Sequence, residues 1–348
     1  MGENLIINAA KKSFIALKNP YQSVVKAFPE NLNYFETKNV DYHYIGVKNK
    51  KHIPRSLLNK LTNNGNYLLH TVDAYSLGGR AVDISLKNPI SGKPMTGSSS
   101  GTAINVLIGI NDLGIGTDGG GSVLAPAMSV NLFGFISKLI EEDHVKQFVN
   151  QSTDKISFTV SIGYITRTFL EMQRALSATF PELRTIVKKT NPLSIFTLDG
   201  QKVASALPQE NKDIRITSLS HPDIYGPREP LIAFLETHLA NCDFLISEEG
   251  PVDYQGFGDT VIGHMGEKTY EQQLLAKKGL IRVINMANAT AIVVPKKEFA
   301  TGYVLICESS FEKIEPMLRF AEKLALPPDE LINRYFSNFD HYFPEEFL

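Results

Sequence analysis

Two glycine- and serine-rich stretches decide how this sequence is interpreted: Thr96-Gly97-Ser98-Ser99-Ser100-Gly101 and Gly116-Thr117-Asp118-Gly119-Gly120-Gly121-Ser122. Ser122 follows Ser98 by 24 residues, and three consecutive glycines precede it. Glycine permits unusual backbone angles and a close approach to a ligand, so successive N–H groups can converge on one anionic oxygen. An oxyanion hole requires such convergence. This pattern suits a nucleophilic serine, and its base must come from elsewhere, because no Gly-x-Ser-x-Gly elbow with a histidine partner is present.

Helical and strand-like segments alternate around these two stretches. Helical spacing is expected in the N-terminal segment 1–40, and again in Arg55–Asn63, from Phe169 onward, in Leu231–Ala240 and in Pro316–Ala325. Strands are expected at Asn66–Val72, Cys242–Ile246, Thr290–Val294 and Tyr303–Cys307, the last two as a hairpin-like pair. No linker, repeat or low-complexity tract separates these segments. The order predicts the α/β class, with residues 1–348 forming a single large domain.

Composition excludes several other classes of protein. The chain has 348 residues, with 35 Lys+Arg against 37 Asp+Glu, and no run of like charges, so nucleic acid is not an expected partner. No apolar run reaches the roughly 18 residues of a membrane span. Cys242 and Cys307 are too few for a disulfide framework and are expected to be reduced and buried. The eight histidines are scattered, so no metal site or cofactor is predicted. The N-terminus lacks the order of a secretory signal, which favours the cytoplasm.

The two serine-containing stretches, at this spacing, resemble the signature of the amidase signature family. Ile162-Gly163-Tyr164-Ile165-Thr166-Arg167-Thr168 is similar to that family's segment leading into a helix, and Asn285–Pro295 is similar to one of its strands. Asn88-Pro89 lies where the family has Asn-Pro. The resemblance extends from about residue 42 to 325. It implies an α/β/α domain with a mixed central sheet, in which residues 42–170 hold the core motifs, 170–280 a variable substrate region and 281–348 the C-terminal strands and helix.

The resemblance also implies roles for individual residues. Ser122 would be the nucleophile and Ser98 the bridging serine, held by a cis peptide after Gly97, with Ser99 as its competitor. Lys48 would be the base, with Lys50 and Lys51 as rivals; a lysine in a dry pocket has a lowered pKa and can accept a proton. The predicted oxyanion donors are Gly119, Gly120 and Gly121, and the predicted supporting residues are Ser99, Thr117, Asp118 and Arg167.

The expected function is hydrolysis of a carboxamide through an acyl-serine intermediate, with a linear small-molecule amide as substrate. Two alternatives stay open. The same side chains could pass the acyl group to an amine, giving an amide-forming or transamidating enzyme. The protein could also be a catalytically silent binding protein, because Asn49, Ser100 and Leu124 stand where the family usually has other residues. A homodimer is compatible with either activity.

Overall fold

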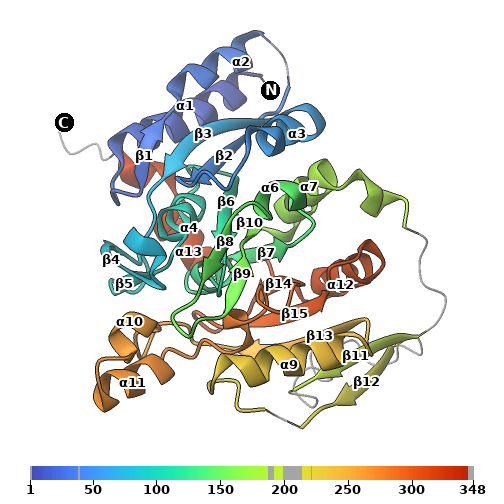
Figure 1. The fold of residues 1–348 in the computed structure, drawn as a ribbon. Coiled ribbons are helices and arrows are strands. Elements are labelled where there is room, and N and C mark those ends of the chain that lie inside the picture. The colour runs from blue at the N-terminus through green and yellow to red at the C-terminus, as the bar shows by residue number, and fades with distance from the viewer. Residues whose placement is uncertain (1, 38–39, 187–191, 199–213, 221, 344–348) are drawn as a thin grey trace.

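The computed structural model describes residues 2–37, 40–186, 192–198, 214–220 and 222–343. Within these ranges, 11 strands form one sheet in the order β1-β3-β2-β6-β10-β7-β14-β15-β13-β11-β12 (Figure 1). The strands are β1 Val24–Ala27, β2 His43–Lys48, β3 Tyr67–Asp73, β6 Leu113–Asp118, β7 Phe133–Ser137, β10 Ser161–Thr166, β11 Leu193–Thr197, β12 Ile214–Ser218, β13 Phe244–Glu249, β14 Ala289–Pro295 and β15 Gly302–Glu308. Parallel pairs (β3-β2, β2-β6, β13-β11, β11-β12) flank an antiparallel centre, so the sheet is mixed, as the resemblance implied.

Smaller elements surround this sheet. Two short hairpin sheets pair β4 Val82–Lys87 with β5 Pro94–Thr96, and β8 Val149–Gln151 with β9 Ser157–Thr159. The α-helices are α1 Gly2–Lys18, α2 Leu32–Thr37, α3 Arg55–Gly65, α4 Ser100–Leu107, α5 Leu124–Met128, α6 Glu142–Val145, α7 Phe169–Thr179, α9 Arg228–Leu239, α10 Thr260–Gly263, α11 Glu267–Leu274, α12 Phe311–Leu324 and α13 Glu330–Phe336. Single 3₁₀ turns lie at Pro29–Asn31, Leu77–Gly79, Pro181–Arg184, Leu280–Arg282 and Phe339–Tyr342.

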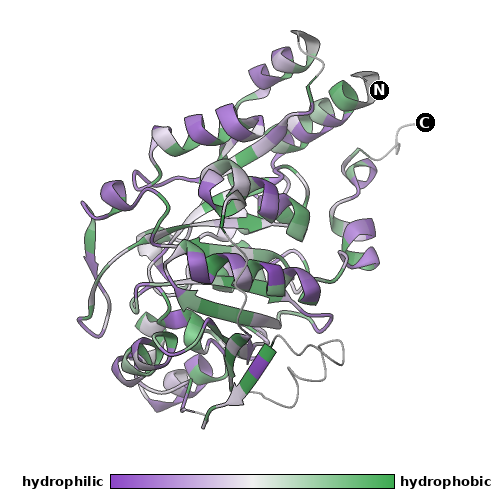
Figure 2. Ribbon diagram, turned by 90° about the vertical axis from the view of Figure 1, so that its right-hand side faces the viewer, coloured by the Kyte–Doolittle hydropathy of each residue, from purple (hydrophilic) through white to green (hydrophobic). Residues whose placement is uncertain are grey.

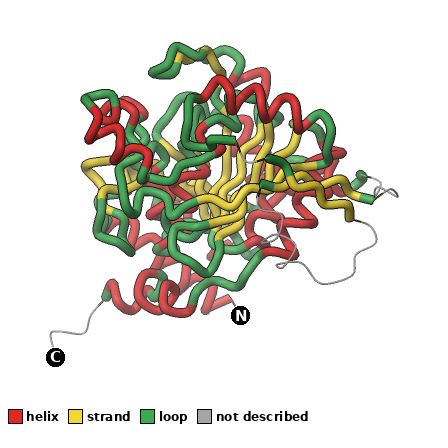
Figure 3. The backbone as a smooth tube through the Cα atoms, turned by 90° about the horizontal axis from the view of Figure 1, so that it is seen from below, coloured by secondary structure: helices red, strands yellow, loops and turns green. Residues whose placement is uncertain are grey.

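Helices cover both faces of the sheet, and the period-two alternation of the strands supplies a core to each face. Along β14, Val293 belongs to a buried cluster that includes residues of α4, α5 and α9, whereas Ile292 belongs to one that includes residues of α3, α7 and α12. Hydrophobic residues are concentrated along the strands (Figure 2), and the view in Figure 3 shows helices on either side of them. This confirms the predicted α/β/α architecture with a mixed central sheet.

Most of the predicted elements are present, with two corrections. The N-terminal segment is not purely helical, because β1 follows α1 and pairs antiparallel with β3. The predicted last helix begins earlier, at Phe311, with Pro316 inside it, and α13 follows it. At the end of β13, the buried carboxylate of Glu249 accepts the backbone N–H groups of residues 279–281.

Two other predictions are tested by the described residues. Both cysteines are free and buried, as expected. Among the helices in the described ranges, none has the length and apolarity needed to cross a membrane.

Candidate active site

The two serine-containing stretches lie side by side in the fold. Ser98 occupies the turn between β5 and α4, and its peptide bond to Gly97 is cis, as the resemblance implied. Ser122 follows β6, just before α5. The backbone N–H of Ser99 donates to the carbonyl oxygen of Ser122 at 3.1 Å, which joins the two turns directly. The predicted pair of serines is therefore brought together by the fold.

Lys48 is the last residue of β2, which runs parallel to both of its neighbours, β3 and β6. The apolar residues Tyr44, Ile45 and Val47 bury this strand, and they carry Lys48 into the interior with only 2% of its surface exposed. Its Nζ lies 2.8 Å from Ser98 Oγ and 3.1 Å from the Thr117 carbonyl oxygen. Burial lowers the pKa of Lys48 from 10.5 to about 7, partly opposed by the charge of Asp118.

The geometry distinguishes Lys48 and Ser98 from their rivals. Lys50 Nζ lies 4.3 Å from the centre of the Tyr75 ring, and Lys51 Nζ lies 5.3 Å from that of Phe148. Ser99 is fully buried, and its Oγ has no hydrogen-bond partner among the described residues. Among the predicted lysines and serines in the described part of the chain, Lys48 and Ser98 are the two whose side chains share a hydrogen bond.

Asp118 organises the turn that carries Ser122. Its buried carboxylate accepts the backbone N–H groups of Gly121 at 2.7 Å, Val123 at 2.6 Å and Leu124 at 3.3 Å. Burial raises the pKa of Asp118, and these three bonds oppose the rise. The N–H of Gly121, one of the predicted oxyanion donors, is thus already donated to Asp118. Within the described part of the chain, the N–H groups of Gly119, Gly120 and Ser122 have no partner.

A cavity of about 330 Å³ is lined by the candidate site residues. Its walls include Lys48, Ser98, Thr117, Gly119, Gly120 and Ser122. Arg167, predicted as a supporting residue, is elsewhere: its Nη2 donates to Asn333 Oδ1 at 2.7 Å, and it lines a separate cavity beside α13. Among the described residues, no hydrogen bond joins the Ser98 and Ser122 hydroxyls.

Asn285 also supports the Ser122 turn. Its Nδ2 donates to the carbonyl oxygens of Gly119 at 3.1 Å and Thr159 at 3.0 Å, and its Oδ1 accepts the hydroxyl of Ser161. The sequence indicated this residue only as the start of a family-like segment. Its bonds fix the glycine turn against β9 and β10 from the side opposite Lys48's strand.

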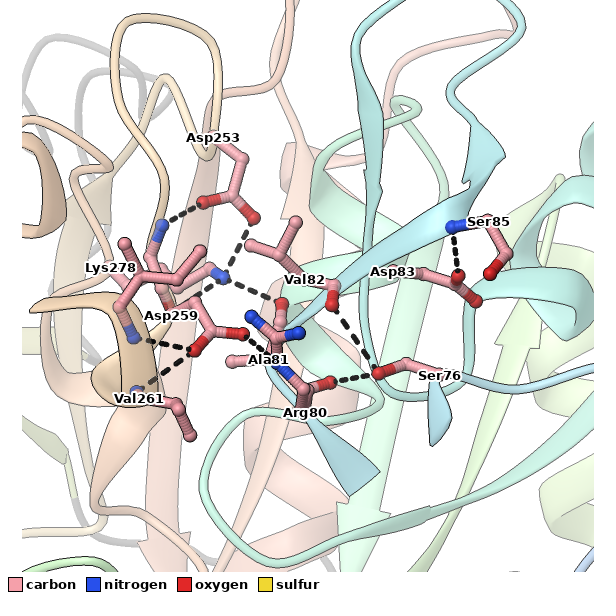
Figure 4. Close-up of polar contacts among 12 residues, drawn as sticks. Ser76, Arg80, Ala81, Val82, Asp83, Ser85, Asp253, Asp259, Val261 and Lys278 are labelled. Carbon is pink, nitrogen blue, oxygen red and sulfur yellow. Dashed lines mark hydrogen bonds and ion pairs between the residues drawn. The ribbon is translucent and has the colours of Figure 1, made fainter. Parts of the chain in front are cut away.

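None of the sequence motifs predicted the further polar residues of the cavity wall, which include His52, Arg80, Arg228 and Asp259. Figure 4 shows how part of this wall is held together: Arg80 Nε donates to Asp259 Oδ2 at 3.0 Å, and Lys278 Nζ bridges Asp253 Oδ2 and the Ala81 carbonyl oxygen. These residues come from segments far apart in the chain, so no local motif marks them. The described residues contain no group of three or more His, Cys, Asp or Glu side chains placed to hold a metal ion.

Comparison with known proteins finds a family model that matches part of the chain. A family model described as "Amidase" matches residues 86–245, which include both serines, whereas Lys48 lies before the matched region. The predicted resemblance to the amidase signature family is confirmed. No curated protein sequence matched the chain.

Solved structures with amidase folds match most of the chain at low identity. A bacterial aryl acylamidase of the amidase signature family matches with a TM-score of 0.64 and 13% identity. The match covers 97% of this chain and 95% of that one. A Kluyveromyces lactis allophanate hydrolase variant gives 0.60 and 14% identity, and the match covers 88% of this chain but only 66% of that one. A 6-aminohexanoate cyclic dimer hydrolase gives 0.59 and 11% over 93% and 92%. These matches establish the fold, and the family match supports amide hydrolysis.

Proposed function

We propose that this protein hydrolyses a small-molecule carboxamide through an acyl-enzyme formed on Ser122, with Ser98 and Lys48 as the proton relay. The observation that carries the proposal is the 2.8 Å contact between Lys48 Nζ and Ser98 Oγ in the wall of a cavity that Ser122 shares. A buried lysine with a pKa of about 7 is neutral in a large fraction of molecules at neutral pH. A neutral amine can accept the proton that a nucleophilic serine must lose.

In the acylation step, Ser122 Oγ attacks the amide carbonyl carbon and gives its proton to Ser98, while Ser98 gives its own proton to Lys48. The carbonyl π electrons move to oxygen and form a tetrahedral oxyanion. When the C–N bond breaks, the relay runs in reverse and protonates the departing amine. Water then attacks the acyl carbon of the ester, loses a proton to the same relay, and releases a carboxylic acid and free Ser122.

The oxyanion would be stabilised by backbone donors of the Ser122 turn. Gly119 and Gly120 stay as proposed donors, and the unpartnered N–H of Ser122 joins them, because Gly121 is bonded to Asp118. Asp118 then acts as a brace that keeps the turn in shape, since an oxyanion hole works only if its donors are already oriented.

The relay further requires the Ser122 hydroxyl to donate to Ser98 Oγ. Serine side chains occupy three staggered rotamers, and catalytic hydrogen bonds are often completed only with substrate bound. Rotation about the Cα–Cβ bond of Ser122 is the movement that the proposal demands. In the proposed mechanism the two serines have different roles: Ser122 forms the covalent bond, and Ser98 only transfers protons.

Intact-mass spectrometry after treatment with a fluorophosphonate probe tests the proposal. One adduct is expected on the wild type, none on Ser122→Ala, and slow labelling of Ser98→Ala and Lys48→Ala. Lys51→Ala is the matched control and should label at the wild-type rate, because Lys51 lies beside Phe148 and outside the relay. An adduct that persists in Ser122→Ala would place the nucleophile elsewhere. Absence of any adduct on the folded wild type would favour a silent binding protein.

A further inference from the structure

The cavity that contains Ser122 is rich in positive charge. Its described lining includes the basic side chains Lys50, Arg80 and Arg228 in addition to Lys48, whereas Asp259 is its acidic member. The same excess affects His52, whose pKa is lowered by burial and then by the nearby lysines. A cavity built only for a neutral amide has no need of this charge, since each cation costs free energy when it is removed from water.

The two arginines differ in how their guanidinium groups are engaged. Arg80 uses its Nε to bond Asp259, a carboxylate that is 1% exposed, so its side-facing edge is occupied. Arg228 bonds Asp154 at 2.7 Å through Nη1. Its Nε is buried and has no hydrogen-bond partner among the described residues, and its hydrogen bond and ion pair both use Nη1 and not Nη2.

The free nitrogens of Arg228 form a specific geometric unit. Within the guanidinium plane, Nη1 lies cis to Cδ. Nε and Nη2 therefore form the edge away from Cδ, which carries two parallel N–H donors. That edge matches the two oxygens of a carboxylate, which is the arrangement of bidentate arginine–carboxylate pairs. A buried donor left unpaired is costly, so a ligand that satisfies both donors would bind with a clear advantage.

Arg228 also occupies a distinctive position in the cavity. A second cavity, of about 310 Å³, shares Thr153, Arg228 and Thr260 with the one that contains Ser122, so Arg228 stands where the two spaces meet. Arg282 lines this second cavity, and its pKa is lowered by burial and then by the positive charge of Arg228. An anion at the junction would reduce the repulsion between these two arginines.

We propose that the substrate is an amide bearing a carboxylate, and that the Nε and Nη2 donors of Arg228 bind this carboxylate while the amide carbonyl lies at Ser122. The assignment of the reacting end rests on the proposed function, whereas the recognition of an anionic ligand does not. Arg228 is then a specificity-determining residue. Arg80, tied to Asp259, helps to hold the wall and contributes charge.

Calorimetric titration of the Ser122→Ala protein tests the inference, because this variant leaves the ligand intact. The probes are malonamate, succinamate and glutaramate, each compared with the neutral amide of the same acyl chain length, such as butanamide for succinamate. At least one carboxylated amide should bind about 10- to 100-fold more tightly than its neutral counterpart. Adding Arg228→Gln should remove this difference, and Arg228→Lys, which keeps the charge but loses the two-donor edge, should restore only part of it.

Arg174→Gln is the matched control, since Arg174 is an exposed arginine on α7 that lines neither cavity and pairs with Glu171. It should change neither affinity, and near-ultraviolet circular dichroism verifies that each variant is folded. Equal affinities for charged and neutral amides, or an Arg228→Gln effect equal for both, would overturn the inference. If fluorophosphonate labels Ser122 in the wild type, such a result refutes carboxylate recognition alone. If Ser122 is not labelled but Arg228-dependent binding is found, the proposed hydrolysis fails and anion recognition stands.

Discussion

Replacing Lys48 with methionine should stabilise the folded protein at neutral pH while slowing the labelling of Ser122. Methionine is close to lysine in length and carries no charge, so it fits the buried end of β2 without the cost of a desolvated ammonium group. A lysine present only for stability would have the opposite effect. The perturbation therefore separates a residue maintained for its chemistry from one that supports the fold.

The magnitude follows from the pKa of Lys48, which falls from 10.5 in the unfolded chain to about 7 in the fold. Between these values the unfolded chain binds the proton and the folded protein does not, so the stability of the wild type rises with pH in this window. At about 1.4 kcal/mol per pKa unit, the lowered pKa of Lys48 reduces the free energy of unfolding by about 4 kcal/mol at pH 7 and about 2 kcal/mol at pH 9. Losing the two hydrogen bonds of Nζ offsets about 2 kcal/mol. Lys48→Met should gain about 2 kcal/mol at pH 7 and nothing at pH 9.

Urea unfolding followed by circular dichroism at pH 7, 8 and 9 measures these differences directly. The exposed Lys87 on β4 provides the control, because Lys87→Met should show a difference from the wild type that does not vary with pH. The reasoning is refuted if the stability difference between Lys48→Met and the wild type is independent of pH, or if it grows more favourable as the pH rises.

Three further outcomes are expected. The rate of Ser122 labelling should rise with pH through about 7, because deprotonation of Lys48 creates the proton acceptor. Mass spectrometry of reactions quenched at set times, from pH 5 to 9, would measure this rate. Gly116→Ala should lower the free energy of unfolding by about 1–3 kcal/mol, since its Cβ would lie 2.5 Å from Ser99 Oγ; an unchanged urea midpoint would contradict this. Asp118→Asn removes the charge that raises the pKa of Lys48, so the labelling profile should shift to lower pH, and a shift upward would argue against the assigned contact.

The parts of the candidate site that lie within short sequence motifs could be predicted from the sequence. Ser98 and Ser122 lie in glycine-rich turns whose composition marks them as candidate site residues, and the fold brings the two turns together. The helix beginning after Thr168 was also predictable, because the threonine hydroxyl accepts the N–H of Glu171 as an N-cap. Patterns of this kind depend on neighbours within a few residues, and the chain's own sequence records them.

Other features depend on contacts that no local pattern encodes. β2 is short and includes Gly46, and its strand character comes from lying between β3 and β6 rather than from a long apolar run. The hydrogen bond from the Gly121 N–H to the Asp118 carboxylate depends on how the side chain is oriented within the turn, which the sequence does not specify. Arg228 joins the cavity from the start of α9, more than a hundred residues after Ser122 in the chain, so its role required the tertiary structure.

Bond cleavage and substrate selection are physically separable in this arrangement. The pKa of Lys48 is lowered by burial and by the charge of Lys50 and is raised by the charge of Asp118, and Arg228 is not among these causes. A substitution at Arg228 therefore changes which ligand is held without changing the base, whereas a substitution at Asp118 alters the base for every ligand. The pH dependence of Ser122 labelling by a neutral probe should accordingly be the same in Arg228→Gln and in the wild type. A shifted profile in Arg228→Gln would mean that the two functions are electrostatically coupled and that Arg228 acts partly through Lys48.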